Sequence, residues 1–207
     1  IGNPPYVNFA NLPESSRNQF KKNSIYKNKT DLYAFFISLS NDLKRKKGYI
    51  SMIIPHTWVS TTSFLPLRKL FFNELNLEKI VDLDFGVFKD AYVKTTVILC
   101  SPSYSRDINI YDENFNLKTT IPKKLIETDI QFKINLTWNR IKYDLYSKIK
   151  ENSKKLGDIV HFTRGIKTSN DNRFIFKEDK GEDFYKLIRG RNIKAYTINY
   201  DKEFIWY

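Results

Sequence analysis

The sequence IGNPPY, residues 1–6, joins the end of an apolar strand to a rigid turn. Each proline fixes φ near about −65° and has no backbone N–H, so the carbonyl groups of the turn lack local partners. A following proline also holds Asn3 and Pro4 extended. A turn directly after a strand lies at the carboxyl edge of a sheet, where α/β proteins place their ligands. The stretch therefore indicates a site at a sheet edge; without the strand-like Ile1-Gly2 it would indicate a proline-rich surface turn.

The chemistry of this turn suits an amino group attached to a flat ring. The Asn3 side chain and the Pro4 backbone each offer a carbonyl oxygen as an acceptor. Together these acceptors can hold both hydrogens of an exocyclic amine, while the ring of Tyr6 stacks on the attached base. We therefore predict that the turn fixes an amine from one side and leaves the other side open to attack.

The segments after the turn alternate between helical and strand-like patterns. Residues 7–29 are polar and basic without a period and predict a loop. Apolar residues at helical spacing predict helices over 30–48 and 62–76, and short apolar runs predict strands over 49–55, 77–84 and 94–101. This alternation predicts an α/β sheet. The core face of the first helix is predicted to contain Leu32, Phe35, Phe36, Leu39 and Leu43.

The pattern changes after Ser101, which predicts three regions: a first domain over 1–104, a linker with one strand and one helix over 105–153, and a second domain over 154–207. The linker helix, 139–152, has Ile141, Leu145, Tyr146 and Ile149 on one face. The last region is turn-rich and predicts a β-rich domain with short strands at 158–165, 173–176, 185–190, 195–200 and 203–207.

Composition narrows the class of partner. The net charge of +12 favours a polyanionic partner. A solvated basic surface without a ligand is the alternative, because the chain is also rich in Asn and Ile, as AT-biased coding produces. The single cysteine, Cys100, predicts a reducing compartment, and the separated His56 and His161 predict no metal site. No apolar run approaches the roughly 18 residues of a membrane span, so we expect a soluble intracellular protein without a membrane partner.

Several stretches, in the same order, resemble the N6-adenine DNA methyltransferases of restriction–modification systems, of the TaqI-like and Eco57I-like type. Asn3-Pro4-Pro5-Tyr6 matches the catalytic turn of that family. The resemblance continues through DLYAFF (31–36), YISMIIPHTW (49–58) and FGVFKDAYVKTTVILC (85–100), and then through LGDIVHFTRGIKTSNDNRF (156–174) and LIRGRNIKAY (187–196). It implies the C-terminal half of a Rossmann-like methyltransferase sheet, followed by the start of a β-rich target-recognition domain.

The resemblance also implies roles for individual residues. Asn3 and the Pro4 carbonyl would accept hydrogen bonds from the adenine N6 amino group after the base has flipped out of the duplex, and Tyr6 and Phe88 would stack on its two faces. Pro5 and Phe36 would line the adenine end of S-adenosylmethionine. Arg164, Lys167, Arg189 and Arg191 would contact double-stranded DNA; each of them alone could equally be a solvated surface charge.

The family binds this cofactor mainly through a glycine-rich half that precedes the catalytic turn, and this sequence contains no G-x-G element. We therefore interpret the chain as a fragment, inactive by itself, of a bacterial cytoplasmic enzyme. Removing the preceding strand would leave an apolar sheet edge exposed, so the isolated chain is predicted to self-associate. The resemblance leaves open whether the parent protein also carries a type II restriction endonuclease.

Two other functions remain at this point. The same turn occurs in methyltransferases that act on protein glutamine, and related turns occur in rRNA methyltransferases; such chains would end soon after the last strand of the sheet. The other alternative is a DNA-binding specificity module without activity, which the intact Asn3–Tyr6 turn argues against.

Overall fold

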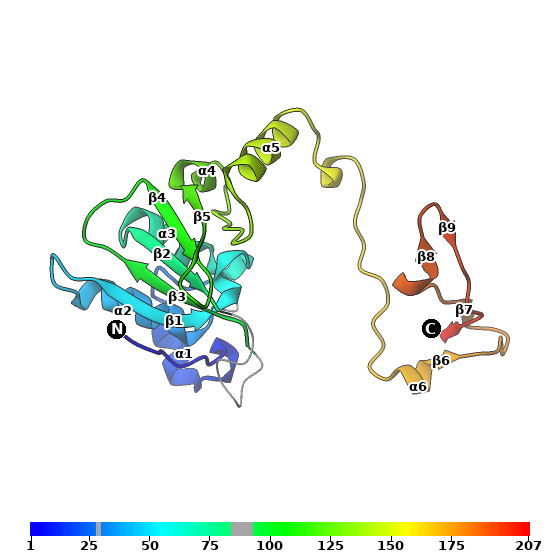
Figure 1. Cartoon of the computed structure of the whole chain (residues 1–207). Helices are drawn as coiled ribbons and strands as arrows, with labels where there is room; N and C mark the ends of the chain where they lie inside the picture. Colours follow the sequence, from blue (N-terminus) through cyan, green and yellow to red (C-terminus); the bar gives the residue numbers. More distant parts are fainter. Residues whose placement is uncertain (28–29, 84–92) are drawn as a thin grey trace. The chain divides into compact units, whose positions relative to one another are not determined.

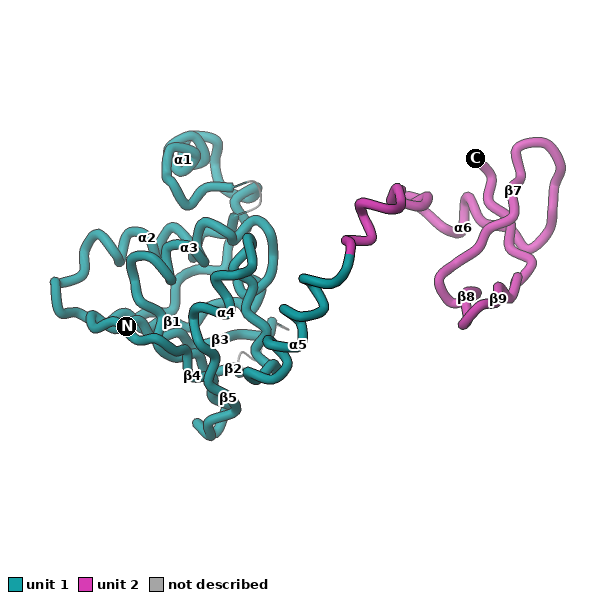
Figure 2. The backbone as a smooth tube through the Cα atoms, turned by 90° about the horizontal axis from the view of Figure 1, so that it is seen from above, with its two compact units in different colours: residues 1–153 teal, residues 154–207 magenta. Residues whose placement is uncertain are grey.

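The computed structural model describes residues 1–27, 30–83 and 93–207, and Figure 1 shows the whole chain. The chain divides into two compact units, residues 1–153 and residues 154–207 (Figure 2). Phe88, one of the predicted base-stacking residues, lies outside the described residues.

Unit 1 is built on a five-stranded mixed sheet, which confirms the predicted α/β class. Its strands are β1 (Ile50–Pro55), β2 (Leu77–Asp82), β3 (Thr95–Cys100), β4 (Asp107–Tyr111) and β5 (Leu117–Pro122), in the order β1-β3-β2-β4-β5. Strand β3 lies between β1 and β2 and is antiparallel to both. Strand β4 is parallel to β2, and β5 is antiparallel to β4.

Helices α2 (Leu32–Leu43) and α3 (Leu65–Asn73) cover one face of this sheet (Figures 1 and 2). Pro66 lies in the first turn of α3, where its missing N–H costs nothing. Alternate residues of β1 point to the face that the helices cover, and they are buried in the same core as residues of both helices. The core includes Tyr33, Ile37, Ile54, Leu67 and Phe71.

The predicted core face of α2 is partly wrong. Phe35 is buried, but Phe36, Leu39 and Leu43 are exposed at 42%, 51% and 74%. The helix packs instead through Tyr33, Ala34, Phe35 and Ile37. Both faces of α2 carry apolar residues, so the helical period alone could not decide which one meets the sheet.

The segment predicted as a loop, 7–29, also contains ordered elements. A 3-10 helix, η1 (Phe9–Asn11), precedes helix α1 (Glu14–Phe20). The ring of Phe20 packs on Phe35 of α2, with 4.6 Å between centroids. Because α1 buries no residue fully, it lacks the apolar stripe by which a helix is predicted.

Residues 105–153 differ from the predicted linker with one strand and one helix. They contain β4, β5, helix α4 (Lys123–Glu127) and helix α5 (Arg140–Glu151), and they belong to unit 1. Ile108 and Ile110 of β4 are buried, whereas β5 is largely polar because it forms the edge of the sheet. The apolar face predicted for α5 is exposed, and only Tyr143 of that helix is buried.

Unit 2 contains two small antiparallel sheets. One has the order β6-β10-β7, formed by Ile175–Phe176, Phe204–Trp206 and Phe184–Lys186; the other pairs β8 (Ile193–Lys194) with β9 (Thr197–Ile198). Helix α6 (Asp171–Phe174) precedes β6, and two 3-10 helices, η4 (Leu156–Asp158) and η5 (Gly190–Asn192), complete the unit. The strand predicted over 158–165 is not formed.

Over residues 1–27, 30–83 and 93–207, no helix is long and apolar enough to cross a membrane.

Candidate active site

The turn at residues 3–6 directly follows a backbone pairing with β1. Gly2 forms a parallel bridge with Met52: its N–H donates to the Ser51 carbonyl at 3.0 Å, and its carbonyl accepts from the Ile53 N–H at 3.1 Å. The chain at Gly2 therefore runs beside β1 in the same direction. Asn3 consequently emerges at the carboxyl edge of the sheet, as the sequence predicts.

The two predicted acceptors are available in this geometry. Asn3 is exposed, Pro4 is buried and Pro5 is exposed. Within the described part of the chain, neither the Asn3 side chain nor the Pro4 carbonyl takes part in a hydrogen bond. The turn thus presents a side-chain carbonyl and a backbone carbonyl that a ligand amine can use.

Tyr6 is held as a fixed wall beside the turn. Its hydroxyl donates to the Ile53 carbonyl at 3.0 Å, and its ring meets the edge of Tyr33, with centroids 6.4 Å apart and planes at 79°. Partial burial raises the pKa of Tyr6, so the hydroxyl remains a donor at neutral pH. Its position is therefore fixed by β1 and α2 rather than by a ligand.

The downstream side of the turn is attached to α2. The Leu32 N–H donates to the Val7 carbonyl at 2.9 Å, and Asn8 bridges Asp31 in antiparallel fashion. Phe36 lies one helical turn beyond Leu32 and is exposed. The turn is thus fixed to β1 on one side and to the start of α2 on the other.

A charged cluster occupies the same edge of the sheet farther along. Asp82 ends β2, and its nearly buried carboxylate pairs with Lys94 at 3.1 Å and with Lys118 of β5 at 3.0 Å. His56 follows β1, and its backbone N–H donates to the Lys94 carbonyl at 2.8 Å. Burial and then the nearby Lys94 lower the pKa of His56, so its imidazole is neutral at pH 7.

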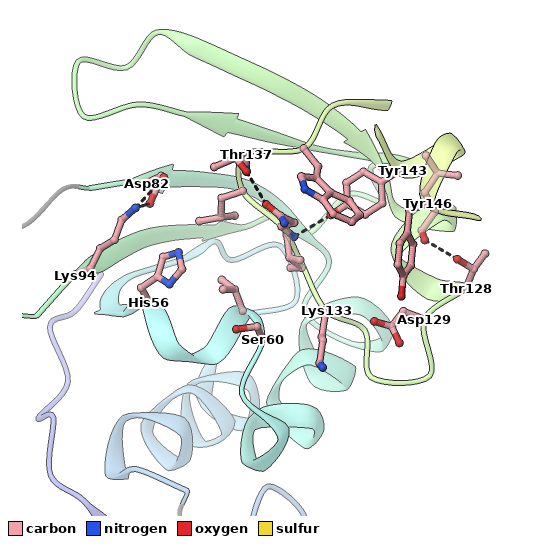
Figure 3. Close-up of a pocket in the computed structure, with 16 residues that line it drawn as sticks. His56, Ser60, Asp82, Lys94, Thr128, Asp129, Lys133, Thr137, Tyr143 and Tyr146 are labelled. Atoms are coloured by element: carbon pink, nitrogen blue, oxygen red, sulfur yellow. Dashed lines mark hydrogen bonds and ion pairs between the residues drawn. The ribbon is translucent and has the colours of Figure 1, made fainter. Parts of the chain in front are cut away.

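This cluster forms one side of a cavity of about 430 Å³ (Figure 3). The other side comes from the segment between α4 and α5, including Asp129 and Lys133, and from aromatic residues of α5 and its approach. Trp138 packs against both Tyr143 and Tyr146, with centroids 5.2 Å and 5.3 Å apart. No described residue of the Asn3–Tyr6 turn lines this cavity, so it is a separate hollow at the same sheet edge.

Arg68 of α3 connects the segment after β1 to the segment between α4 and α5. It is fully buried and donates to the carbonyls of Trp58 at 2.6 Å, Thr61 at 2.9 Å and Gln131 at 2.8 Å. Sequence reasoning missed this role because Arg68 lies in an ordinary amphipathic helix pattern. It missed the cavity as well, because the aromatic wall comes from residues predicted to be a linker.

The four predicted DNA-contacting residues fall into two groups in unit 2. Arg164 and Lys167 are exposed in the segment between η4 and α6. Arg189 and Arg191 instead surround the buried Glu203: Arg189 Nε and Arg191 Nη2 each donate to Glu203 Oε2 at 2.9 Å. Arg189 also pairs with Asp171, and Arg191 with Asp201. The second pair therefore stabilises unit 2, whatever else it contacts.

Comparison with known proteins identifies a matching family profile and several similar proteins. Residues 1–88 match the family profile described as Eco57I restriction-modification methylase. The type II restriction enzyme and methyltransferase RM.Eco57I of Escherichia coli is 25% identical over 207 residues, covering 88% of this chain and 20% of that protein. The type II methyltransferase M.HincII of Haemophilus influenzae is 36% identical over 134 residues, covering 62% of this chain and 26% of that protein.

The chain is homologous to type II restriction–modification methyltransferases. It spans about a fifth to a quarter of the length of these two relatives. Among solved structures, the type IIG restriction endonuclease BpuSI has a TM-score of 0.44 at 18% identity, covering 53% of this chain and 14% of that one. The M protein of the type I enzyme EcoKI has a TM-score of 0.42 at 16% identity, covering 53% and 24%.

Proposed function

We propose that this chain is part of a DNA methyltransferase that transfers a methyl group from S-adenosylmethionine to adenine N6 in duplex DNA, within a restriction–modification system. The observation that carries the proposal is the geometry of the turn. Asn3 and the Pro4 carbonyl stand at the carboxyl edge of the sheet as unused acceptors, beside the fixed ring of Tyr6.

In this proposal the turn binds the amino group of the target base. The Asn3 side-chain oxygen and the Pro4 carbonyl accept one N6 hydrogen each, which draws electron density onto the nitrogen. The nitrogen would take the methyl group as the methyl–sulfur bond of the sulfonium breaks, leaving a neutral thioether, and one N6 proton would pass to solvent. No strong general base is required, so catalysis consists mainly of placement and electrostatic stabilisation.

Stacking on aromatic side chains offsets the free-energy cost of extruding the base. Taking a nucleotide out of the duplex costs a few kcal/mol. Stacking on an aromatic side chain returns roughly 1–3 kcal/mol per base. Tyr6 supplies one such surface because its hydroxyl is tied to Ile53 and its ring is held edge-on by Tyr33. We assign the opposite face of the base to Phe88 from the sequence alone.

The residues beside the turn fit one end of the cofactor. Pro5 is exposed at the turn, and Phe36 is exposed on α2, the helix whose first residue bonds to Val7. These two apolar side chains can cover the edge of an adenine ring. When bound, S-adenosylmethionine supplies a methyl group on a sulfonium that is already a good leaving group. We assign most of its binding to a part of the protein upstream of residue 1.

We assign recognition of double-stranded DNA to unit 2, with Arg164 and Lys167 as phosphate or base contacts. Arg189 and Arg191 remain in that set, although their ion pairs restrict what they can reach. RM.Eco57I is described as both restriction enzyme and methyltransferase, which supports a nuclease in the same full-length protein. We infer that the enzyme acts in the bacterial cytoplasm, where its DNA substrate lies.

A DNA-binding specificity module without activity is the second candidate. The exposed basic residues of unit 2 would serve such a module equally well. An intact Asn3-Pro4 acceptor pair that no described residue uses as a hydrogen-bond partner has no purpose in it, which favours the enzyme.

The test uses the full-length protein, labelled S-adenosylmethionine and unmethylated plasmid DNA. Replacing Asn3 by Ala removes one acceptor and should lower kcat/KM for DNA by about a hundredfold or more. The matched control is Asn11→Ala, which alters an exposed asparagine eight residues along the chain. Equal methylation by wild-type protein and Asn3→Ala would refute the proposed role of the turn.

A further inference from the structure

The hairpin formed by β8 and β9 projects from the fold of unit 2 with an apolar surface exposed. Ile193 and Ile198 pair across its strands and are 58% and 59% exposed, and Tyr196 at its turn is fully exposed. Solvated hairpins ordinarily carry polar residues at such positions. The exposed residues therefore indicate a surface that is covered when the protein works.

The base of this hairpin is firmly attached. Asn192 is buried, its side chain accepts from the Arg189 N–H at 2.7 Å, and its carbonyl accepts from the Asn199 N–H at 2.7 Å. Arg189 and Arg191, on either side of Gly190 just before Asn192, both form ion pairs with Glu203. The hairpin is thus presented from a fixed base, which limits the conformational entropy lost when its tip binds.

Tyr196 occupies a conformation that costs free energy. Its φ is +60°, in the left-handed region, where a bulky side chain is an outlier and glycine or asparagine is expected. Nothing in the turn repays this strain, because the ring extends into solvent. A strained aromatic residue at a fixed, exposed tip is a feature that binding can explain.

The hairpin formed by β4 and β5 has a similar tip but a different charge. The turn between β4 and β5 carries Phe115 at φ +62°, exposed at 73%, but it also carries Asp112 and Glu113. The β8–β9 hairpin, residues 192–199, contains Lys194 and no acidic residue. The two tips share a backbone geometry and an aromatic residue, but only the β8–β9 tip is complementary to a polyanion.

We propose that the β8–β9 hairpin enters the major groove of the DNA, with Tyr196 packed against base edges or an unstacked base at its tip. A two-stranded ribbon fits the width of that groove. The flanking Lys194 then lies close to the phosphate backbone. This inference rests on the proposed DNA methyltransferase function and names the element that carries DNA recognition.

The test compares glycine substitutions at the two hairpin tips in the full-length protein. Tyr196→Gly and Phe115→Gly both relieve a left-handed backbone, so neither should lower the melting temperature. Methyl transfer to unmethylated plasmid DNA is then measured over a range of DNA concentrations. Tyr196→Gly should raise KM for DNA about tenfold and change kcat little, whereas Phe115→Gly should change neither. Tyr196→Phe keeps the ring and should retain the wild-type KM.

The outcomes separate this inference from the function on which it rests. An active wild-type protein whose Tyr196→Gly variant has a KM within about twofold of wild type would overturn the hairpin assignment and leave the function intact. Equal increases for both glycine variants would also overturn it, because the effect would then be general to relaxed hairpins. A wild-type protein that binds DNA without methylating it would refute the proposed function while the same variants still test the hairpin by binding.

Discussion

Arg68 is a buried cation that, among the described residues, forms no ion pair with a carboxylate. Its Nε and Nη1 donate to the carbonyls of Trp58, Thr61 and Gln131, whereas Nη2 has no hydrogen-bond partner among the described residues; burial lowers the pKa of Arg68 to about 10. It therefore remains charged at neutral pH. Through these bonds one side chain ties the segment after β1 to the segment that walls the cavity.

Replacing Arg68 by Met should destabilise the protein by about 3 kcal/mol, because it leaves three buried carbonyls without donors. Denaturant unfolding monitored by fluorescence measures the change. Lys69→Met, at the exposed neighbouring position, should stay within about 0.5 kcal/mol of wild type. A loss below about 1 kcal/mol for Arg68→Met would show that water or a rearrangement satisfies those carbonyls.

The geometry of the Asn3–Tyr6 turn could be predicted from the sequence because it is local. Two prolines and an asparagine fix their own geometry, and the strand in front fixes the edge. The roles of Arg68 and Asp82 could not be predicted in this way. Each depends on partners from segments distant in the chain, such as Gln131 or Lys118, and a lone charge in a helix or strand gives no sign of them.

At the scale of elements, the small sheet of unit 2 depends on one buried carboxylate. Glu203 precedes β10 and accepts hydrogen bonds from Lys177, Arg189 and Arg191. The bond from Lys177 and then the one from Arg189 lower the pKa of Glu203. These contacts hold η5 and β10 together and so support the β8–β9 hairpin.

The pH dependence of unit 2 follows from this shift. Because the folded pKa is below the unfolded value, Glu203 contributes stability that is present above the unfolded pKa, near 4.5, and is lost as the pH falls through the folded pKa. The protection factors of the β10 amides, which compare their exchange rates with those of the unfolded chain at the same pH, should fall over that range. Glu203→Gln should have lower protection factors at pH 7 and lose less protection on acidification; identical profiles of protection against pH for both proteins would contradict this role of Glu203.

The strands and long helices of unit 1 were predictable from periodicity, whereas the packing direction of its helices was not. Helix α2 has apolar residues on two faces, and only the position of β1 and α3 decides that Tyr33 and Ile37 are buried while Leu39 is not. Strand β5 and helix α1 were missed because a sheet edge and a surface helix need few apolar residues. The strands of unit 2 have only two or three residues, too few to show a period.

At the scale of the whole molecule, β1 stands at one edge of the described sheet and pairs on its outer side only at Gly2. The exposed apolar residues of α2 are Phe36, Leu39 and Leu43. An unpaired strand edge together with apolar surface favours association between copies.

We therefore predict that residues 1–207 expressed alone self-associate at tens of micromolar, as measured by light scattering. Replacing both Leu39 and Leu43 by Lys should weaken that association, because their side chains are exposed and contribute little to the core. The control is Lys69→Ala, which alters an exposed residue. A control at Leu67 would be unsuitable because that side chain is fully buried. A clean monomer of the unaltered chain would contradict the prediction.

We propose that the Asn3–Tyr6 turn holds the amino group of an adenine in DNA. The most direct test lets the full-length protein methylate unmethylated plasmid DNA with labelled S-adenosylmethionine, digests the product to nucleosides and identifies the labelled one. We expect the label in N6-methyl-2′-deoxyadenosine and its loss in Asn3→Ala, with Asn11→Ala unaffected. Label in a cytosine derivative, in RNA or in protein would contradict it.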